Sequence, residues 1–518
     1  MENDKNIDDD YVGSPKVVSL SELKDATAIL RAQGKTIALC HGTFDLLHIG
    51  HIRHIARAKK IADAVIVTLT ADAYVSKGPG RPVFNEQLRA EQIAALADVD
   101  LVAINFAVTA INVIELLKPD FYVKGSDYKN PDDDVTGNIS LEEQATTNIG
   151  GSIVFTEELT FSSSKLLNEN FDVLPPQTRS FLNEFKKKYR FEEICEAVKA
   201  VSDVRVLVFG DAIIDEYNYA KALGHSGKYN VLSAQHLSAE KFAGGALAVA
   251  KHIASISPNV TIATGIGSYE SDEGFIRDKL GESIGKQLFH FSDAPTIKKK
   301  RFLDDDGNRF FEIYHYKSDP ICERFESEVC EWLEANVKDF DLVVIPDFGN
   351  GLITPRMIDI CCKEARKLAV NTQVNSGNRG FHQISKYSRS DFICLNEAEL
   401  RLAAKDNVSG LEPIAKKVAV QQAASFLAVT RGTKGVLVYE SVRDGFFSIP
   451  ALSSKVIDRV GAGDAFLAYV SVLLAAKCDG AVAGFVGSAA AALGVQIVCN
   501  REAVELPALL PYLNTLLK

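Results

Sequence analysis

The stretch Arg459-Val-Gly-Ala-Gly-Asp464 joins a loop to a helix near the C-terminal end of the chain. Small apolar residues dominate from Ala465 to Ala476, which is typical of a buried helix. The first amide groups of a helix have no partner within it, so the turn predicts a binding site for phosphate oxygens. A carboxylate is unfavourable beside phosphate, so we expect Asp464 to be a general base in phosphoryl transfer. The simpler interpretation is a strand-to-helix turn with glycine at positive φ and an acidic first helical turn.

The length and composition indicate a multidomain globular protein. A chain of 518 residues allows about three ordinary domains or two large ones. Apolar residues make up 47% and charged residues 24%, which is the balance of a globular protein. The formal net charge of −11 disfavours bulk binding to nucleic acid or anionic membrane. We therefore expect small-molecule partners, with no nucleic acid and no membrane.

The cysteines and the N-terminus indicate a cytoplasmic protein. Nine cysteines without a C-x-x-C pair favour neither a disulfide framework nor a zinc site. The acidic, polar start of the chain has no apolar segment, so no signal peptide is expected. The sequence contains no uninterrupted run of about 18 apolar residues, so no membrane span is expected. Residues 1–16 are expected to form a disordered tail.

A second site is predicted at His41-Gly-Thr-Phe-Asp-Leu-Leu-His48-Ile-Gly-His51. It lies between a short apolar strand, expected at 36–40, and a helix that continues from 52 to 60. His48 and His51 are three residues apart, so they share one face at a helix start that attracts anions. Two such imidazoles can hydrogen-bond the oxygens of a nucleoside triphosphate while its α-phosphate is attacked. The alternative is a structural histidine pair; zinc is disfavoured because no carboxylate or cysteine has ligand-like spacing.

Strands and helices alternate between residues 64 and 123, which predicts a parallel sheet with ligands at its carboxyl edge. Three polar loops follow expected strands or precede a helix. Lys77-Gly-Pro-Gly-Arg81 is glycine-rich and basic, so it is either a phosphate-covering loop or an ordinary turn. Lys124-Gly-Ser-Asp-Tyr128 lies at the carboxyl edge, and Ser162-Ser-Ser-Lys165 has more hydroxyl groups than one helix cap requires.

These motifs resemble the HxGH-type nucleotidyltransferases over about residues 17–170. Within that superfamily they are most similar to the nucleotidyltransferase module of the bifunctional heptose kinase/heptose-phosphate adenylyltransferases, and next to glycerol-phosphate cytidylyltransferases. The resemblance implies that His48 and His51 stabilise the transition state, and it leaves ATP or CTP open. The implied nucleotide- and phosphate-binding residues are Thr43, Phe44, Lys77, Arg81, Lys124, Ser162, Ser163 and Ser164, and the implied substrate-binding residues are Asp45 and Asp127.

A second alternation of strands and helices begins after a helical linker expected at residues 171–200. Apolar strands expected at 204–209, 342–346, 393–396 and 427–430 are each followed by polar or glycine-rich residues. A helix is expected to open at Gly244-Gly245. Apolar and charged residues alternate from Lys298 to Tyr316, which predicts a hairpin with Asp306-Gly307 at its turn. Such an inserted hairpin is expected to form a lid or a subunit contact.

The motifs Gly210-Asp211, Asp347-Phe-Gly-Asn-Gly351 and Asn396-Glu-Ala-Glu399, with the glycine turn, resemble the ribokinase-like sugar kinases over about residues 200–518. The resemblance implies that Asp464 deprotonates the acceptor hydroxyl and that Glu399 holds Mg²⁺ through water. The implied nucleotide- and phosphate-binding residues are Asn396, Glu399, Thr430, Gly432, Gly461, Ala462 and Gly463, and the implied sugar-binding residues are Asp211, Asp215, Gly244 and Gly245.

Three departures from the kinase pattern bear on the substrate. The usual Asp-Thr before the glycine turn is Asp458-Arg459, which affects a monovalent cation site or the nucleotide phosphates. The helix after Gly245 lacks the usual asparagine, and Asn375-Ser-Gly-Asn-Arg379 replaces an Asp-Pro-Lys motif. The sugar therefore stays open, and a seven-carbon sugar is expected from overall similarity.

The predicted fold is α/β, with two doubly wound parallel-sheet domains: a Rossmann-like nucleotidyltransferase at 17–170 and a ribokinase-like kinase with a small β lid at 201–518. The whole chain resembles the bifunctional heptose enzymes with their modules in reversed order. We expect a cytoplasmic homodimer that uses ATP and Mg²⁺, acts on sugars and sugar phosphates, and makes a nucleotide-activated sugar in ADP-heptose precursor synthesis. One alternative is a cytidylyltransferase for a polyol or other alcohol phosphate fused to a sugar kinase. Another is a kinase fold that has become a binding or dimerisation module.

Overall fold

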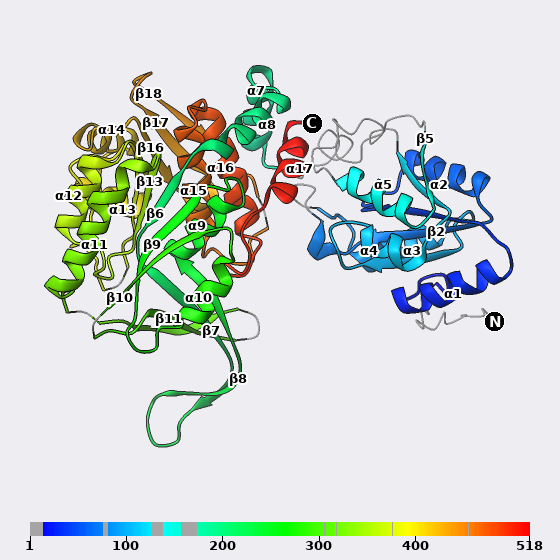
Figure 1. The fold of residues 1–518 in the computed structure, drawn as a ribbon, viewed down its shortest axis with the longest axis horizontal. Coiled ribbons are helices and arrows are strands. Elements are labelled where there is room, and N and C mark those ends of the chain that lie inside the picture. Colours follow the sequence, from blue (N-terminus) through cyan, green and yellow to red (C-terminus); the bar gives the residue numbers. More distant parts are fainter. Residues whose placement is uncertain are drawn as a thin grey trace, which may run out of the picture. The chain divides into compact units, whose positions relative to one another are not determined.

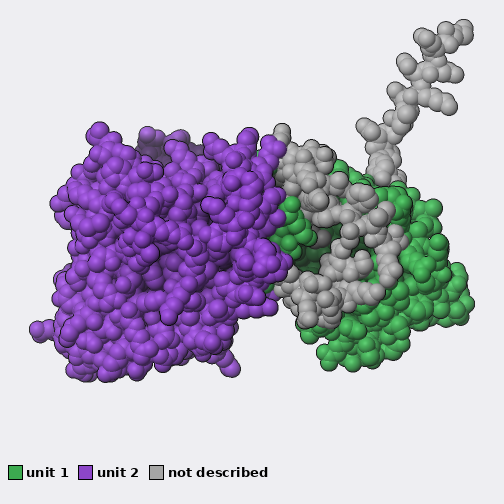
Figure 2. All heavy atoms as spheres, turned by 90° about the horizontal axis from the view of Figure 1, so that it is seen from above, with its two compact units in different colours: residues 1–174, 510–516, 518 green, residues 175–509, 517 purple. Residues whose placement is uncertain are grey.

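The chain divides into two compact units (Figure 2). The computed structural model describes residues 14–75, 81–125, 138–156, 174–291, 293–304, 307–317, 319–375, 377–453 and 455–518. The first unit contains residues 1–174, 510–516 and 518, and the second contains residues 175–509 and 517. Among the described residues, no helix is long and apolar enough to cross a lipid bilayer.

The first unit is built on a parallel sheet in the strand order β3-β2-β1-β4-β5 (Figure 1). Apolar side chains from opposite faces of these strands form two separate cores, each covered by helices. The predicted doubly wound parallel sheet is therefore confirmed in this unit. Its elements are β1 (Ile37–Gly42), β2 (Ala64–Thr70), β3 (Leu101–Asn105), β4 (Phe121–Gly125), β5 (Ser152–Thr156), α1 (Leu20–Ala32), α2 (Ile49–Ile61), α3 (Glu86–Ala94), α4 (Ile111–Leu117) and α5 (Asn138–Asn148).

A buried arginine fixes the loop that follows β1. Arg89 of α3 is fully buried and donates hydrogen bonds to the carbonyl oxygens of Thr43 and Thr70. It also contacts the Asp72 carboxylate at 2.6 Å, which compensates its charge. A buried guanidinium needs several acceptors at fixed positions, so Arg89 holds the end of β1 against the end of β2.

The second unit is built on a larger sheet in the order β10-β9-β6-β13-β14-β15-β16-β17-β18 (Figure 1). The pairs from β10 to β16 are parallel, whereas β16, β17 and β18 pair antiparallel because tight turns join them. The strands are β6 (Val206–Phe209), β9 (Val260–Ile266), β10 (Gly285–His290), β13 (Leu342–Asp347), β14 (Leu368–Thr372), β15 (Phe392–Asn396), β16 (Phe426–Thr430), β17 (Val436–Glu440) and β18 (Gly445–Ile449).

Helices follow most strands of the larger sheet. Buried residues of several of them join the strand residues in one large apolar cluster. The helices of this unit are α7 (Pro176–Lys188), α8 (Phe191–Lys199), α9 (Ala246–Ala254), α10 (Glu273–Leu280), α11 (Glu323–Asn336), α12 (Pro355–Glu364), α13 (Glu397–Ala404), α14 (Leu411–Gln421), α15 (Ala462–Ala475) and α16 (Gly480–Gly494). The last helix, α17 (Leu506–Leu517), has residues 510–516 in the first unit.

A small second sheet, in the order β12-β11-β7-β8, belongs to the same unit. The predicted hairpin is confirmed as β11 (Ile297–Leu303) paired antiparallel with β12 (Arg309–His315), although Asp306 of its expected turn lies outside the described residues. Sequence reasoning missed the other half, β7 (Ala212–His225) and β8 (Leu232–Gly245). These strands project from the unit as a long arm (Figure 1). The arm's outer residues are largely exposed, so they lack the buried-strand pattern that predicts a core strand.

The segment expected to connect the two modules forms α7 and α8, which belong to the second unit. The Phe185 ring lies 4.4 Å from that of Phe485 on α16. The Tyr189 hydroxyl donates to Asp479 at 3.0 Å. Apolar and polar contacts together therefore attach these helices to α16.

Candidate active sites

The glycine turn at the start of α15 exposes backbone amide groups. Gly461 caps this helix in the left-handed region at φ 94°, and its carbonyl accepts from the Ala465 amide at 2.9 Å. A β-carbon at Gly461 would lie 2.1 Å from Asn500 Oδ1, so the turn packs too closely for a side chain. Gly463 faces open space. The amides of Ala462 and Gly463 are therefore placed as the turn predicts for an anion site.

Asp464 lies in the first turn of α15, near the Asp215 carboxylate and the Lys299 ammonium group. Burial, with a contribution from the neighbouring Asp215, raises the pKa of Asp464 to about 7. Lys299 and the Asn500 side chain oppose this shift. A carboxyl group with a pKa near neutrality can both accept and release a proton at physiological pH.

Asp211 is buried with an unsatisfied oxygen. Its Oδ2 accepts from the backbone and side-chain nitrogens of Asn350, each at 3.4 Å. Its Oδ1 has no hydrogen-bond donor within the described part of the chain. Burial, with a contribution from Asp347, raises the pKa of Asp211 to about 6. A buried acceptor without a donor costs free energy unless a ligand supplies one.

The two glycines before α9 allow Asp211 and Asp215 to lie close to the backbone. A β-carbon at Gly244 would lie 2.1 Å from Asp215 Oδ2, and one at Gly245 would lie 2.5 Å from the Asp211 carbonyl oxygen. Gly245 also has a φ of 59°, which favours glycine. Asp215 forms a buried ion pair with Arg301 of β11. Gly244 is thus required by the packing of the Asp215 carboxylate, and Gly245 by its positive φ and the close Asp211 backbone.

Asp347 anchors the loop that supplies Asn350. Its carboxylate accepts from the Tyr387 hydroxyl at 2.6 Å and pairs with Lys386 at 2.5 Å. His382 lies 3.3 Å from the other carboxylate oxygen, which also accepts from the Gly349 amide. These contacts use the Asp347 carboxylate internally, so its role is to position the loop beside Asp211.

Asn396 and Glu399 form a capping box at the start of α13. Asn396 Oδ1 accepts from the Glu399 amide at 2.9 Å, and Glu399 Oε2 accepts from the Asn396 amide at 2.8 Å. Glu399 Oε1 also accepts from the Val374 amide, and burial raises the Glu399 pKa to about 7. Helix capping therefore accounts for these contacts. Among the described residues, no three acidic, histidine or cysteine side chains are arranged to hold a metal ion.

The other predicted nucleotide-binding positions of the second unit lie at the end of β16. Thr430 is its last residue and pairs with Val436 of β17. Gly432 follows at φ 56° and begins a short 3₁₀ turn. Both precede the antiparallel edge of the large sheet.

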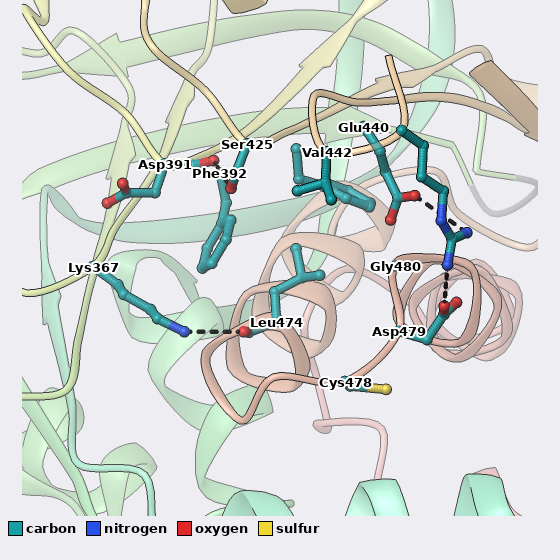
Figure 3. A pocket seen from close by; sticks show the side chains of 12 residues that line it. Lys367, Asp391, Phe392, Ser425, Glu440, Val442, Leu474, Cys478, Asp479 and Gly480 are labelled. Atoms are coloured by element: carbon teal, nitrogen blue, oxygen red, sulfur yellow. Dashed lines mark hydrogen bonds and ion pairs between the residues drawn. The ribbon is translucent and has the colours of Figure 1, made fainter. Parts of the chain in front are cut away.

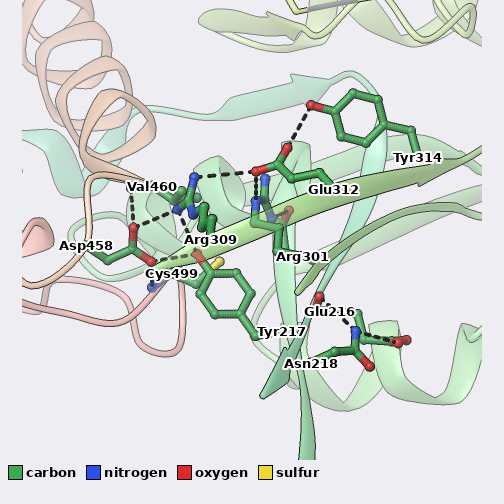
Figure 4. A network of polar contacts seen from close by, with 11 residues as sticks. Glu216, Tyr217, Asn218, Arg301, Arg309, Glu312, Tyr314, Asp458, Val460 and Cys499 are labelled. Atoms are coloured by element: carbon green, nitrogen blue, oxygen red, sulfur yellow. Dashed lines mark hydrogen bonds and ion pairs between the residues drawn. The ribbon is translucent and has the colours of Figure 1, made fainter. Parts of the chain in front are cut away.

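Asp458 connects the glycine turn to the small sheet (Figure 4). It accepts from the Tyr217 hydroxyl of β7 at 2.6 Å and contacts Arg309 of β12 at 3.2 Å. The amides of Val460 and Cys499 donate to it at 3.1 Å. The aspartate before the turn is therefore an internal anchor for the turn.

Sequence reasoning missed three polar residues that the fold brings to this site: Lys299, Asn500 and Asn350. Lys299 lies within a basic run, Lys298 to Arg301, whose alternation on a strand places two cations on each face. This alternation could have predicted from the sequence that Lys299 shares a strand face with Arg301. Asn500 follows α16 by several residues, and no local pattern connects it to Asp464.

In the first unit, the two predicted catalytic histidines lie together at the start of α2. His48 caps the helix, and its Nδ1 accepts from the Gly50 amide at 3.1 Å. The His51 ring stacks on it with 3.9 Å between centroids, and Phe44 contacts His51 edge-on at 5.2 Å. Burial lowers the pKa of His48, which favours a neutral ring at physiological pH.

Several predicted ligand residues of this unit are paired with one another. Arg81 and Asp45 form a buried ion pair at 2.7 Å, and Asp45 also accepts from the Val83 amide. Lys124 pairs at 2.9 Å with buried Glu142, a residue that sequence reasoning did not select. Thr43 is buried, and its carbonyl accepts from Arg89. Lys77, Asp127, Ser162, Ser163 and Ser164 lie outside the described residues.

A cavity of about 360 Å³ in the second unit contains none of the predicted site residues (Figure 3). Its charged lining is satisfied internally. Lys367 donates to the Leu474 and Ala475 carbonyls, which end α15. Arg443 contacts Glu440 at 3.4 Å and Asp479 at 2.6 Å. The two helix starts therefore remain the candidate active sites.

Family models match both parts of the chain. A model of the pfkB family carbohydrate kinases matches residues 204–500, and a cytidylyltransferase-like model matches residues 39–170. The bifunctional protein HldE of Citrifermentans bemidjiense is 26% identical over 313 residues, covering 58% of this chain and 62% of that protein. HldE of Syntrophotalea carbinolica is 38% identical over 115 residues, covering 22% and 24%. The chain thus matches less than two thirds of the length of these relatives.

Solved structures resemble the second unit in fold. Phosphofructokinase-2 from Escherichia coli in complex with substrates and products has a TM-score of 0.50 at 13% identity, covering 61% of this chain and 100% of that one. Ribokinase from Thermotoga maritima has a TM-score of 0.49 at 19% identity, covering 60% and 99%. At these identities the likeness of phosphofructokinase-2 shows a common fold, as predicted.

The geometry of the glycine turn predicts unequal effects for its two glycines. Gly461→Ala forces a side chain into the left-handed region and against Asn500, so we expect a loss of about 2 kcal/mol of unfolding free energy. Gly463→Ala meets open space and is expected to change stability by less than about 1 kcal/mol. Urea unfolding of the full chain measures both. Equal losses would show that contact with Asn500 and positive φ do not constrain the turn.

Proposed function

The chain belongs to the pfkB family of carbohydrate kinases, and from this premise we propose that residues 201–518 transfer the γ-phosphoryl group of ATP to a sugar hydroxyl. The observation that carries the proposal is Asp464 in the first turn of α15, where exposed backbone amides and a base of near-neutral pKa meet. Asp464 takes the hydroxyl proton, while the amides of Gly461, Ala462 and Gly463 stabilise charge on the transferred group.

The acidic residues after β6 support a sugar as the acceptor. Asp211 Oδ1 is buried without a donor in the described structure, and a sugar hydroxyl would supply one. Asp215 is held by Arg301 and lies near Asp464, so it would orient a second hydroxyl. Asp211, Asp215 and the Gly244-Gly245 turn thus form the proposed sugar-binding side of the site.

Mg²⁺ would enter this site with the nucleotide. The Asn396 and Glu399 oxygens already accept backbone amides, so a hard cation would meet them through its water shell. When bound, the ion would offset charge on the ATP phosphates. Thr430 and Gly432, at the end of β16, would border the nucleotide.

We propose that residues 17–170 transfer a nucleotidyl group to a sugar phosphate and release pyrophosphate. The stacked His48 and His51 at the start of α2 support this role, because neutral imidazoles there can donate hydrogen bonds to α-phosphate oxygens. Thr43 and Phe44 border the same helix start. Lys77, Asp127 and the serines at 162–164 complete the proposed nucleotide and substrate contacts, together with Lys124.

Arg81, Asp45 and Lys124 would need new contacts to bind ligands directly. Each is already in an ion pair, Arg81 with Asp45 and Lys124 with Glu142. A triphosphate could replace the carboxylate partners because it presents more oxygen acceptors to the same cations. Direct binding by these residues therefore requires an exchange of partners.

Together the two activities would make a nucleotide-activated sugar, and we propose that it is a precursor or product of ADP-heptose synthesis. Relatives of this chain carry the name bifunctional protein HldE, and both family models match within one polypeptide. The nucleotidyltransferase comes first here, the reverse of the usual order in that family. The nucleotide substrates and nine cysteines that form no disulfide bond support a cytoplasmic location.

A second candidate function is a cytidylyltransferase fused to the sugar kinase. The family model that matches residues 39–170 describes cytidylyltransferase-like proteins, and this match favours CTP as the nucleotide in this alternative. In this alternative the acceptor would be a polyol or other alcohol phosphate.

The two activities are expected to be separable by single substitutions. Asp464→Asn should lower kinase turnover by about a thousandfold, because the base is lost, and leave pyrophosphate release intact. His51→Ala should lower pyrophosphate release by about a hundredfold and leave the kinase intact. Coupled assays of ADP and pyrophosphate on the full chain measure both. If both activities persist in Asp464→Asn, the assignment of the base is wrong.

The nucleotide and acceptor of the first unit are tested by one substrate panel. The full chain is incubated with ATP or CTP and with heptose 1-phosphate or glycerol 3-phosphate, and pyrophosphate is scored. ATP with the heptose phosphate is expected to give the highest rate. CTP with the glycerol phosphate as the best pair would instead establish the cytidylyltransferase alternative.

We propose that the chain forms a homodimer through its small sheet. β12 is an edge strand of that sheet, and Phe311 and Ile313 on it are 52% and 48% exposed. An exposed apolar edge strand favours pairing with another strand, and a second copy of the chain supplies an equivalent edge.

A double substitution on β12 tests this dimer. Phe311→Asp with Ile313→Asp should convert the dimer to a monomer, because charge replaces the apolar contact. Light scattering after size-exclusion chromatography measures the mass. Val408→Asp, at a 95% exposed position between α13 and α14, is the control and should leave the mass unchanged. A monomeric wild-type chain would refute the dimer.

A further inference from the structure

Lys299 occupies the centre of the small sheet beside the kinase site. On β11 it pairs in register with Asp215 of β7 on one side and Tyr314 of β12 on the other. Its side chain is 5% exposed. Its ammonium group lies 5.3 Å from the ring of Phe348 and 5.5 Å from the ring of Tyr314. A buried lysine between two aromatic rings is held in one place without a direct ion pair.

The cations around Lys299 differ in how they are neutralised. Arg301, two residues along the same face, pairs with Asp215 and contacts Glu312 at 3.2 Å. Lys298 and Lys300 point to the opposite face, where they contact Glu270, Asp272 and Glu216. Within the described part of the chain, no carboxylate oxygen lies within 4.0 Å of the Lys299 ammonium. Its charge is therefore shared among more distant carboxylates.

The groups that face Lys299 come from four elements of the site. Asp211 directly precedes β7, and Asp215 lies on β7. Asp464 lies on α15, and Arg301 lies on β11 with Lys299. Asp464 in turn also faces Asp215, the Asn500 amide and the thiol of Cys394 on β15. Of all these groups, Lys299 and Arg301 are the cations, and Arg301 is already paired with Asp215. Lys299 is thus the cation left to compensate Asp464.

We propose that Lys299 is a positioning residue of the kinase site, whose ammonium group keeps Asp464 ionised so that Asp464 can accept the proton of the sugar hydroxyl. This inference rests on the proposed kinase function and adds a residue that the motifs do not contain. No bond to Lys299 forms or breaks: the proton passes from the hydroxyl to the Asp464 carboxylate, and the hydroxyl oxygen attacks the γ-phosphorus as ADP leaves.

The sign of the effect follows from the charges. A cation near a carboxyl group favours its ionised form, so Lys299 lowers the pKa that burial and Asp215 raise. Removing the cation leaves burial and the like charge unopposed, so the carboxyl group will hold its proton to higher pH. Less enzyme then carries an ionised base at neutral pH.

Lys299→Met tests the proposal in the full chain with ATP and the best sugar of the panel. We expect the acid limb of the kcat profile to move up by roughly one pH unit and kcat at pH 7 to fall about fivefold, because the base has a pKa of about 7 in the wild type. KM for the sugar should change less than kcat. Lys299→Arg, which keeps the charge, should restore the position of the acid limb. An acid limb that stays in place in Lys299→Met would overturn the proposal.

Two controls separate this inference from folding and from the proposed function. Lys300→Met removes a cation from the opposite face of the same strand and should leave the acid limb in place. Pyrophosphate release by the same protein samples reports intact folding of the other unit.

If no sugar in the panel is phosphorylated, the role of Lys299 is tested by a measurement that needs no catalytic turnover. Carbon-13 NMR of aspartate-labelled protein follows the Asp464 carboxyl group, with Asp464→Asn assigning its signal. A higher titration midpoint in Lys299→Met than in wild type supports the role of Lys299 even if the kinase proposal fails. Equal midpoints overturn it.

Discussion

Incomplete neutralisation of buried carboxylates is the constraint on which the kinase site depends. Burial alone would protonate Asp211, Asp464 and Glu399, whose pKa values rise to about 6, 7 and 7. Each keeps access to its ionised form through a few specific contacts: Asn350 amides for Asp211, capping amides for Glu399, and Lys299 with Asn500 for Asp464. The Asp347 carboxylate, in contrast, pairs with Lys386 and accepts from the Tyr387 hydroxyl and the Gly349 amide. The fold therefore gives carboxylates around the site full ion pairs and leaves those inside the site only partly neutralised.

Both units present their candidate site in the same way, at the first turn of a helix. In the second unit the turn is glycine-rich, no side chain caps α15, and a β-carbon at Gly463 would meet open space. In the first unit His48 itself caps α2, which directs its ring toward the helix start and stacks it on His51. A glycine turn suits an anion bound by amides, whereas a histidine cap adds side-chain donors whose protonation can change. The two constructions thus match terminal phosphoryl transfer and nucleotidyl transfer, respectively.

Local sequence patterns predicted the parts of the fold that local physics determines. Apolar runs identified strands such as β2 and β13, and the Gly-Gly and glycine turns marked the starts of α9 and α15. The outer parts of β7 and β8 escaped prediction because their side chains are exposed and their pairing is with each other. Lys299 and Asn500 reach Asp464 only through tertiary packing. The pairing of Arg81 with Asp45 was equally hidden, since residues of opposite charge can be 36 positions apart and still satisfy each other.

Asp458, which precedes the departure at Arg459, is held by contacts within the unit. A carboxylate offers about four acceptor positions. In this chain Tyr217, Arg309 and the amides of Val460 and Cys499 donate to them. A monovalent cation at Asp458 would have to displace one of these donors, and Arg309 already brings a positive charge to the carboxylate. Because Arg309 lies on β12 and Tyr217 on β7, that charge also ties the glycine turn to the small sheet. The same sheet carries Lys299, so the turn proposed to hold phosphate and the cation proposed to act on Asp464 are fixed by one element.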